Sequence, residues 1–577
     1  NKNYSAWKNT VIFTADDTDP IFGYCQFAEE ADELARIVEQ NHPAYMVNKS
    51  YMDAFQPTDE NGKRTYPDAK QKLMHTLKEG CFLFNYTGHG SPTSMSAKDM
   101  MNISTIRQMN FESLPLWITA TCDFGRYDDN RMSAGEEVLL NKKSAGIALF
   151  TTTRVVYGAQ NQILNRFIIQ NIFSKKGDRY RTLGDILRDS KLDYGSDNNK
   201  LNFILIGDPA LQLNYPEWEV ALESINEQPV ATDAPVNFRA LDPITLKGIV
   251  KDGQGNRMDN FTGSIQATIF DGKQVIRPVT APLTEEDEWS FADYPNVVYK
   301  GSAGVENGQF SLSFKVPLDI SYTANPGKMN FYAWDKNRGI DATGVFTNYT
   351  LSGTSDNVHL NEIGPEIEEI YLNTAAFRNG DNVNETPFFY ASVFDEDGIN
   401  RTGSGLGHDI TICIDNNPAW IYSLNNYFTS GSEFGHGVIG FPIPELPAGP
   451  HELGFKVWDI LNNPTTDSLQ FTVVKGLQPR ISNVWAAPNP AREKTVFCLE
   501  HDRPESVLEV ELRVYDLTGR AVWSHTETGS SRLSHTIEWD LTSGNGRRIT
   551  PGIYVYQAFI KTVGGKEATQ SKKLIVL

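Results

Sequence analysis

A histidine stands between two glycines in NYTGHGSP, residues 85–92, directly after the apolar run CFLF. A cysteine, Cys122, closes a second apolar run, LPLWITATC. A thiol beside an imidazole is the pairing that nucleophilic acyl transfer requires, because the base activates the thiol and later protonates the leaving amine. These residue types predict a nucleophile at Cys122 and a general acid/base at His89.

A third group usually orients the base in such a site. Asp16 and Asp17 end the apolar run NTVIFTADD, and a carboxylate there would fix the tautomer of the imidazole. The residues themselves leave both aspartates open for this role.

Each of these residues also has an ordinary structural explanation. A lone cysteine after an apolar strand is usually a small buried hydrophobe, and Gly-His-Gly is often a tight turn. The combination, with polar Asp123 after Cys122, favours catalysis. Cys25, at a predicted helix start, and Cys81, within a predicted strand, have no such neighbours. The five cysteines are scattered, without a CxxC pair, and encode neither a disulfide framework nor a zinc site.

The elements that must position these residues alternate between residues 7 and 213. Short apolar runs, such as CFLFNYTG and GIALFTTTRVV, are each followed by a helix-period segment such as QFAEEADELARIVEQ. This pattern predicts a mostly parallel sheet with helices on its faces. One crossover separates the strands before His89 and Cys122, so we expect the two strands to be adjacent and both side chains to meet at the carboxyl edge.

From about residue 217 onward the helical pattern disappears, and short strands alternate with Pro, Gly, Asn and Asp. We expect a multidomain chain: an α/β domain over residues 1–216, then three all-β sandwich domains of Ig-like type over 217–355, 356–476 and 477–577. An Asp followed by a turn recurs in AWDKNRG, VFDEDGIN, VWDILNN and VYDLTGR. Asp favours turns by bonding the backbone two residues on, which we prefer to structural Ca²⁺ binding; no other cofactor or metal is predicted.

The composition of the chain limits the kinds of partner that the protein is expected to bind. The 577 residues carry 72 Asp and Glu against 52 Lys and Arg, a net charge of −20, which argues against nucleic acid as a partner. No run of 18 apolar residues occurs, so no membrane-spanning helix is predicted.

NYTGHGS, the strand-end Cys122 and the later GDPAL resemble the catalytic domain of the gingipains, caspase-like cysteine peptidases, over about residues 7–213. The resemblance implies that Cys122 is the nucleophile, His89 the general acid/base and Asp16 the orienting acid, with Asp17 as a substitute. It also implies an oxyanion hole made by the backbone N–H groups of Gly90 and Cys122.

Two features depart from that family. Where gingipains carry an acid at the base of the pocket for basic residues, about eleven positions after the orienting acid, this chain has Phe27. Specificity for Arg or Lys is therefore not expected. The chain also begins inside the family's domain, so we expect it to be the C-terminal part of a larger precursor.

The end of the chain carries a second resemblance. AAPNPA, VYDLTGRAVW, ITPGIYVYQ and the terminal KKLIVL are similar to the C-terminal signal domain of type IX secretion cargo. A gingipain-like domain, β modules and an intact signal domain together resemble the sortases of that system. The resemblance implies a location at the outer membrane, on the cell surface, held by a docking protein of the secretion machinery. It also implies secreted cargo with C-terminal signal domains as substrate and an amine of surface lipopolysaccharide as acceptor.

Three functions follow from these residues. The first is a cysteine transpeptidase of the sortase kind. The second is a secreted hydrolytic peptidase of gingipain type, for which an acid near position 27 would be expected. The third, a non-catalytic surface adhesin, is disfavoured by the joint presence of Asp16, His89 and Cys122.

Overall fold

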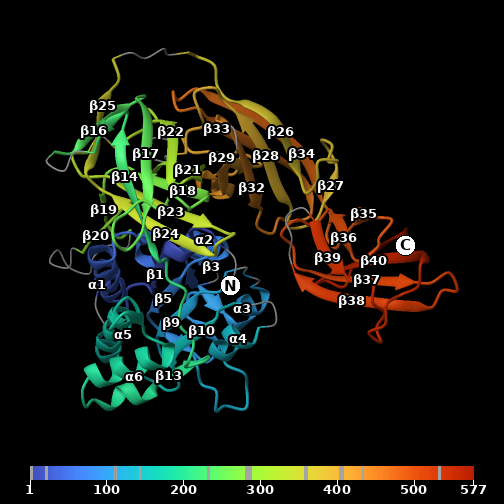
Figure 1. The fold of residues 1–577 in the computed structure, drawn as a ribbon, viewed down its shortest axis with the longest axis horizontal. Coiled ribbons are helices and arrows are strands. Elements are labelled where there is room, and N and C mark those ends of the chain that lie inside the picture. Colours follow the sequence, from blue (N-terminus) through green and yellow to red (C-terminus); the bar gives the residue numbers. More distant parts are fainter. Residues whose placement is uncertain are drawn as a thin grey trace. The chain divides into compact units, whose positions relative to one another are not determined.

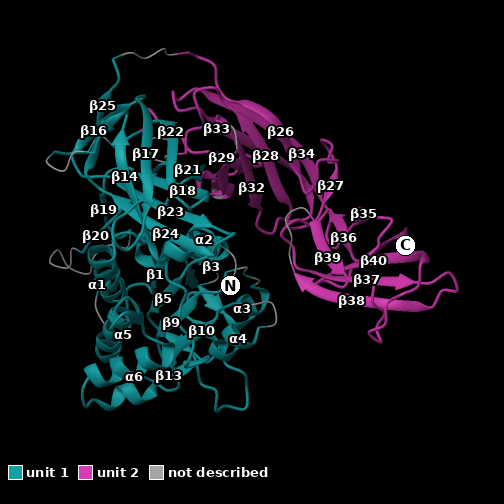
Figure 2. Ribbon diagram, viewed as in Figure 1, with its two compact units in different colours: residues 1–316, 320–356 teal, residues 317–319, 357–577 magenta. Residues whose placement is uncertain are grey.

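The computed structural model describes residues 4–19, 24–60, 62–109, 111, 113–141, 145–230, 234–279, 289–321, 323–356, 361–401, 408–431, 434–529 and 534–577. By internal contacts the chain forms two compact units, one of residues 1–316 and 320–356, the other of residues 317–319 and 357–577 (Figure 2). The predicted boundary at residues 355 and 356 adjoins residues 357–360, which lie outside the described residues.

The first unit begins with a six-stranded sheet in the order β13-β10-β9-β5-β1-β2. Its strands are parallel except β13, which runs antiparallel to β10. They are β1 (Thr10–Ala15), β2 (Met46–Tyr51), β5 (Leu83–Thr87), β9 (Leu116–Ala120), β10 (Ala148–Thr152) and β13 (Phe203–Ile206). The central strands are buried along their whole length, as the continuous apolar runs predict for a parallel sheet covered on both faces.

Helices cover both faces of this sheet, which confirms the prediction (Figure 1). The core on one face includes residues of α1 (Gln26–Asn41), α5 (Gly158–Ile172) and α6 (Leu183–Asp193). The core on the other includes residues of α2 (Pro67–Glu79), α3 (Ile103–Gln108) and α4 (Ala134–Leu140). The short strands of this region are β3 (Thr58–Glu60), β4 (Lys63–Thr65), β6 (Gly90–Ser91), β7 (Ser94–Met95), β8 (Met101–Asn102), β11 (Lys175–Lys176) and β12 (Arg179–Tyr180). The 3₁₀ helices of the described chain are Ala6–Asn9, Met52–Ala54, Asn198–Asn202, Pro418–Trp420 and Asn425–Tyr427.

The β region that follows is built on one large sheet. It comprises β14 (Trp218–Ile225), β15 (Gln228–Pro229), β17 (Pro243–Lys251), β18 (Gly263–Phe270), β21 (Val297–Glu306), β22 (Gln309–Lys315), β23 (Lys328–Asp335) and β24 (Ile340–Phe346). β14 pairs with β17 on one side and with β24 on the other, so the sheet closes on itself. A β-sandwich is predicted for residues 217–355, and the structure has a sheet that closes on itself there; closure pairs strands that would otherwise expose unpaired backbone groups at an edge. Two pairs complete the region: β16 (Val236–Ala240) with β25 (Tyr349–Thr354), and β19 (Gln274–Ile276) with β20 (Phe291–Asp293).

The α/β region and this closed β region share a buried boundary. Trp289 and Phe291 pack their rings against Tyr51 at the end of β2. Lys49, also in β2, donates to the backbone carbonyl of Ala292 at 2.9 Å. The two regions are therefore parts of one folded unit rather than independent modules.

The second unit contains two pairs of sheets, each pair around its own core. The first pair is β26 (Glu366–Leu372), β28 (Phe388–Phe394), β32 (His436–Pro442) and β31 (Phe428–Ser430) against β27 (Asn382–Val383), β34 (Pro464–Val473), β33 (Gly449–Trp458), β29 (Thr411–Ile414) and β30 (Ile421–Ser423). The second pair is β35 (Ile481–Ala487), β36 (Thr495–His501) and β39 (Ser534–Trp539) against β38 (Ala521–Gly529), β37 (Leu508–Tyr515), β40 (Gly552–Thr562) and β41 (Glu567–Val576).

The recurrent aspartates stabilise turns. Asp395 accepts the backbone N–H of Asp397, and Asp459 accepts those of Leu461 and Asn463. Asp335 and Asp516 make the same bond to the residue two positions on. Each side chain thus satisfies the backbone of its own turn, as predicted.

Candidate active site

His89 and Cys122 lie at the carboxyl ends of neighbouring strands. β5 and β9 pair in parallel, with Thr87 opposite Ala120, and each candidate residue stands two positions beyond its member of that pair. Sheet register therefore places the two loops at the same height, and this adjacency is the one that the crossover pattern predicts.

Gly90 allows these loops to approach closely. A Cβ atom on Gly90 would lie 2.3 Å from the hydroxyl of Thr121 and 3.1 Å from the backbone carbonyl oxygen of Cys122. Because such contacts are too short for any side chain, only glycine fits here without displacing the residue beside the thiol. Glycine after the histidine is thus explained by its contact with the cysteine loop.

The predicted oxyanion hole has support from backbone geometry. Gly90 pairs with Met95, while the Ser96 N–H donates to the His89 carbonyl at 3.0 Å. Hydrogen-bonded and non-hydrogen-bonded pairs alternate along an antiparallel ladder, so Gly90 occupies a non-hydrogen-bonded position and its N–H points away from β7. The roles of the Gly90 and Cys122 N–H groups as oxyanion donors stay predictions.

The Cys122 thiol is partly exposed at this edge. Its sulfur lies 3.6 Å from the backbone carbonyl oxygen of Val156, in the segment that follows β10. That segment runs along the cysteine loop, because the Asp123 N–H donates to the Arg154 carbonyl at 3.2 Å. Flanking Val156, Val155 and Tyr157 are 70% and 73% exposed, so the thiol opens onto a surface with apolar side chains.

The other two cysteines of the α/β region are poorly suited to nucleophilic chemistry. Cys25 and Cys81 are fully buried, and burial raises the pKa of both thiols. Because the thiolate is the reactive form, buried thiols of raised pKa are unreactive. Cys25 precedes α1 and Cys81 belongs to the core of the α2 face.

Asp16 is buried below the histidine loop. Its Oδ2 accepts the backbone N–H of His89 at 3.2 Å and the Tyr86 hydroxyl at 3.3 Å, and its Oδ1 accepts the Ser96 hydroxyl at 2.7 Å. Burial raises its pKa to about 6, against the opposing effect of the Ser96 hydrogen bond. The contacts place Asp16 against the backbone of His89; its predicted role in orienting the ring stays a prediction.

Asp17, the alternative orienting acid, has other partners. Its Oδ2 accepts the Tyr66 hydroxyl at 3.0 Å and lies 3.4 Å from the Lys98 ammonium. These contacts direct its carboxyl group toward the residue before α2 and the loop after β7.

Asp19 is the residue that sequence reasoning missed. Its Oδ2 lies 2.8 Å from Nε2 of His89, closer than the 3.2 Å between Asp16 Oδ2 and the backbone nitrogen of this histidine. It lies four residues beyond β1, where no periodic pattern assigns a position. The signal in the sequence that points to it is the acidic cluster DDTD, residues 16–19, of which Asp19 is the last member.

Phe27 also lies at the site. Its ring is 94% buried in α1 and packs edge-on against the His89 imidazole, with centroids 5.0 Å apart at 78°. An apolar ring therefore occupies the position at which the gingipain resemblance expects an acid. Its assignment to a specificity pocket stays a prediction.

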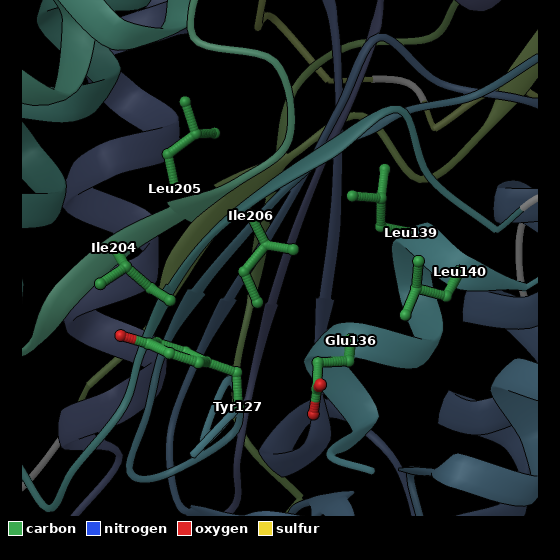
Figure 3. A pocket seen from close by; sticks show the side chains of 7 residues that line it. All are labelled: Tyr127, Glu136, Leu139, Leu140, Ile204, Leu205 and Ile206. Atoms are coloured by element: carbon green, nitrogen blue, oxygen red, sulfur yellow. The ribbon is translucent and has the colours of Figure 1, made fainter.

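A hollow of about 410 Å³ lies elsewhere in the α/β region, between edge strand β13 and α4 (Figure 3). Figure 3 shows Ile204 and Ile206 projecting from β13 toward Tyr127, with Leu139 and Leu140 on the α4 side. None of its lining residues is a predicted site residue. We place the chemistry at the thiol and the imidazole rather than in this hollow, because its lining offers neither a cysteine nor a histidine.

The described residues show neither a cluster of metal ligands nor a membrane-spanning helix. No group of three or more His, Cys, Asp or Glu side chains there is arranged to hold a metal ion. No helix of the described part is both long and apolar enough to cross a membrane.

Comparison with known proteins gives a family match for the first part of the chain. The model of peptidase family C25 matches residues 1–214. Among solved structures, dimeric latent PorU from Porphyromonas gingivalis is 27% identical, over 98% of this chain and 64% of that chain, with a TM-score of 0.33. The Arg-specific cysteine proteinase gingipain R is 16% identical, over 61% of this chain and 69% of that chain, with a TM-score of 0.30. The present chain thus spans 64% of the length of the PorU chain. No curated protein matches it.

The family match covers both strand ends and the residues that follow them, and it agrees with the cysteine peptidase chemistry expected of a thiol beside an imidazole. Residues 1–214 match the model of peptidase family C25, the gingipain family of cysteine peptidases.

Proposed function

We propose that this protein is a cysteine peptidase of the sortase kind, which cleaves C-terminal signal domains from type IX secretion cargo through a thioester on Cys122. The observation that carries the peptidase chemistry is the register of β5 and β9, which sets His89 and Cys122 at equivalent positions beyond Thr87 and Ala120. His89 takes the thiol proton as the sulfur attacks the cargo carbonyl, and returns it to the leaving amine.

The developing oxyanion is stabilised by the N–H groups of Gly90 and Cys122 in this proposal. The Gly90 N–H points away from its own hairpin, and the close approach of Gly90 to Thr121 brings the two backbone segments together. Donors fixed by the backbone stabilise negative charge without rearranging during the reaction.

The side chain at position 27 supports a cargo substrate that does not present Arg or Lys at the cleaved bond. Phe27 contacts the imidazole directly, so a cation entering beside its ring would lose water without gaining a carboxylate partner from this position. A hydrolytic peptidase selective for basic residues would need a different side chain at this position.

Transfer to an amine is the finer part of the proposal. Water and an amine attack the same thioester, so the choice depends on which nucleophile is held near the acyl carbon. We propose an amine of surface lipopolysaccharide as the acceptor, on the resemblance of the chain's α/β, β and C-terminal segments to type IX sortases.

The C-terminal sandwich is the proposed docking module, which holds the protein to an outer-membrane component at the cell surface. The signature segments lie at the end of the chain: Asn489 accepts the Ile575 N–H at 2.9 Å, and the Ala491 N–H donates to the Ile575 carbonyl at 2.8 Å. Asp516 in DLTGR closes the turn between β37 and β38. Such a module is folded to its last strand and offers a stable surface for a partner. Deleting residues 477–577 should mislocalise the protein and leave the active-site thiol reactive; a truncated protein that stays on the surface would contradict docking.

The test of the reaction is the mass of the product. Active protein is incubated with a cargo protein that bears a C-terminal signal domain, together with a glycine peptide as the amine. An amine adduct that is absent with Cys122→Ala supports transpeptidation. A free carboxylate alone, at every amine concentration, would leave a hydrolytic peptidase.

A further inference from the structure

We propose that Asp19 is the positioning residue for the His89 imidazole, and that the buried Asp16 carboxyl group holds the backbone of the histidine loop. The inference rests on the proposed function, since orientation of His89 matters only if His89 serves Cys122. It assigns the orienting role to a residue outside the positions that the family resemblance supplies.

The hydrogen-bonding capacity of Asp16 is the first argument. Its Oδ1 accepts the Ser96 hydroxyl and the Asp17 N–H, and its Oδ2 accepts the His89 N–H and the Tyr86 hydroxyl. A carboxylate has about four lone-pair sites, so these contacts leave Asp16 little capacity to bind the ring as well. The single Tyr86 hydroxyl proton is shared between Asp16 Oδ2 at 3.3 Å and the His89 carbonyl oxygen at 2.7 Å, so this set of contacts fixes the histidine main chain.

Asp19 supplies the contact to the ring. Its Oδ2 is 2.8 Å from His89 Nε2, and its side chain is only 24% exposed, against 43% for the histidine. If the carboxylate accepts the Nε2–H, Nδ1 carries the lone pair and is the atom that takes a proton. The S–H bond of Cys122 then breaks, an N–H bond forms at Nδ1, and the Asp19 carboxylate stabilises the imidazolium without changing its own protonation state.

The segment that carries Asp19 is anchored at the neighbouring residue. Both the backbone N–H and the hydroxyl of Thr18 donate to Asp53 Oδ1 at 3.0 Å, and the Cys25 N–H donates to the Thr18 hydroxyl at 3.0 Å. Thr18 thus ties the start of this segment both to the residues after β2 and to the start of α1. Asp53 is 1% exposed, so the anchor is set in the core.

The anchor continues into the closed β region. The backbone carbonyl of Asp53 accepts the N–H of Val279 at 2.7 Å, three residues beyond β19. A continuous series of contacts therefore links the β region to Asp53, Thr18, Asp19 and the catalytic imidazole. The closed β region would help to hold the geometry of the active site through this series.

The test measures the reactivity of the thiol, so it needs no identified substrate. The full chain is treated with iodoacetamide from pH 5 to 9, and the alkylation rate of each cysteine is followed by peptide mass spectrometry. Three single-charge variants are compared: Asp19→Asn, Asp16→Asn and Asp178→Asn, the last an exposed control in the turn between β11 and β12.

Asp19→Asn should slow Cys122 alkylation at pH 7 about tenfold and move the acid limb of the profile to higher pH, because the imidazolium that accompanies the thiolate loses its counter-charge. Asp178→Asn should give the same pH profile of Cys122 alkylation as the unaltered protein. Asp16→Asn should lower the melting temperature while leaving the position of the acid limb in place. An unchanged profile for Asp19→Asn, or a shifted one for Asp16→Asn alone, would overturn the assignment.

A matched pair tests the anchor. Thr18→Val keeps the shape but removes the hydroxyl that bonds Asp53 and Cys25, whereas Thr18→Ser keeps it. Thr18→Val should shift the profile in the same direction as Asp19→Asn, and Thr18→Ser should restore it. Equal profiles for the two variants would remove Thr18 from the series.

Failure of the proposed function gives a different result. If Cys122 reacts no faster than Cys413 or Cys498, or if His89→Ala leaves its rate unchanged, the nucleophile and base assignment fails. If Cys122 is reactive and depends on His89 while Asp19→Asn has no effect, only the Asp19 assignment fails.

Discussion

His89 and His451 each contact an aspartate, yet only one of them is suited to catalysis. His451, in β33, has Nδ1 2.7 Å from Asp415 and Nε2 2.8 Å from the Pro447 carbonyl oxygen, and its side chain is 6% exposed. Both ring nitrogens are thus engaged by acceptors in a buried position. His89 is 43% exposed and stands opposite a thiol across paired strands. A histidine–carboxylate pair therefore does not by itself indicate catalysis. Its function depends on whether a nucleophile lies beside the histidine and whether a substrate can reach it.

The largest expected effect separates Cys122 from the other thiols. Cys122→Ala should reduce peptide cleavage by about 10⁴-fold or more, because no other group can form the thioester. Cys413→Ala is the matched control, since its thiol is also partly exposed but lies in β29, and it should retain activity. Initial cleavage rates and melting temperatures of both variants check this. Residual activity of Cys122→Ala near the original rate would refute the nucleophile.

Alanine substitution of each histidine tests whether His89 is needed for activity and His451 only for stability. His89→Ala should lose nearly as much activity as Cys122→Ala, and the double variant should lose little more, because members of a catalytic unit are not additive. His451→Ala should retain full activity but unfold more easily, by about 1–3 kcal/mol, since it removes a buried imidazole together with both of its hydrogen bonds. Denaturant unfolding and cleavage assays separate these outcomes. Loss of activity in folded His451→Ala would contradict the distinction.

The surroundings of His89 should also set substrate choice. With Phe27 against the ring, peptides with small or polar residues at P1 should be cleaved at least about tenfold faster than those with Arg or Lys, because a buried cation without a partner is costly. A panel of peptides that differ only at P1 measures this ratio of kcat/KM. Strong selectivity for Arg or Lys would favour a hydrolytic peptidase of gingipain type.

The last expected effect concerns stability and pH and leaves catalysis aside. Burial raises the pKa of Asp16 from 3.8 to about 6, so the folded state binds more protons than the unfolded state between these values. Its contribution therefore favours folding at low pH and is lost as pH rises through about 6. In Asp16→Asn, the change in unfolding free energy between pH 4 and pH 7 should differ from that of the unaltered protein by up to about 3 kcal/mol. Identical pH dependence in the two proteins would show that this carboxyl group is not desolvated.

Much of the α/β region could be predicted because its signals are local. Each buried strand is a continuous apolar run, and one crossover between CFLFNYTG and LPLWITATC suffices to make β5 and β9 neighbours. The two glycines around His89 mark a loop, although the reason for Gly90, its approach to Thr121 and Cys122, exists only in three dimensions.

The missed features depend on contacts between distant segments. Asp19 lies outside any periodic element, and nothing local distinguishes it from Asp16 or Asp17. The closure of the β region pairs Trp218 with Ala342, and a strand's alternation does not identify its partner. A contact such as Val279 with Asp53 is made by backbone atoms, which leave no trace in residue type.

Lys8 illustrates what such distant pairing means for the order of folding. Its ammonium is fully buried and lies 2.6 Å from Asp341, 333 positions further along the chain, whose carboxyl group also accepts the Tyr332 hydroxyl. Until synthesis reaches β24, this charge has no partner, and burying it alone would be strongly unfavourable. The amino-terminal segment can therefore pack only after a strand that lies 333 residues away has been synthesised. Contacts of such high sequence separation favour slow folding, in which this segment docks late. A fragment ending near residue 216 would leave Lys8 permanently without its counter-ion.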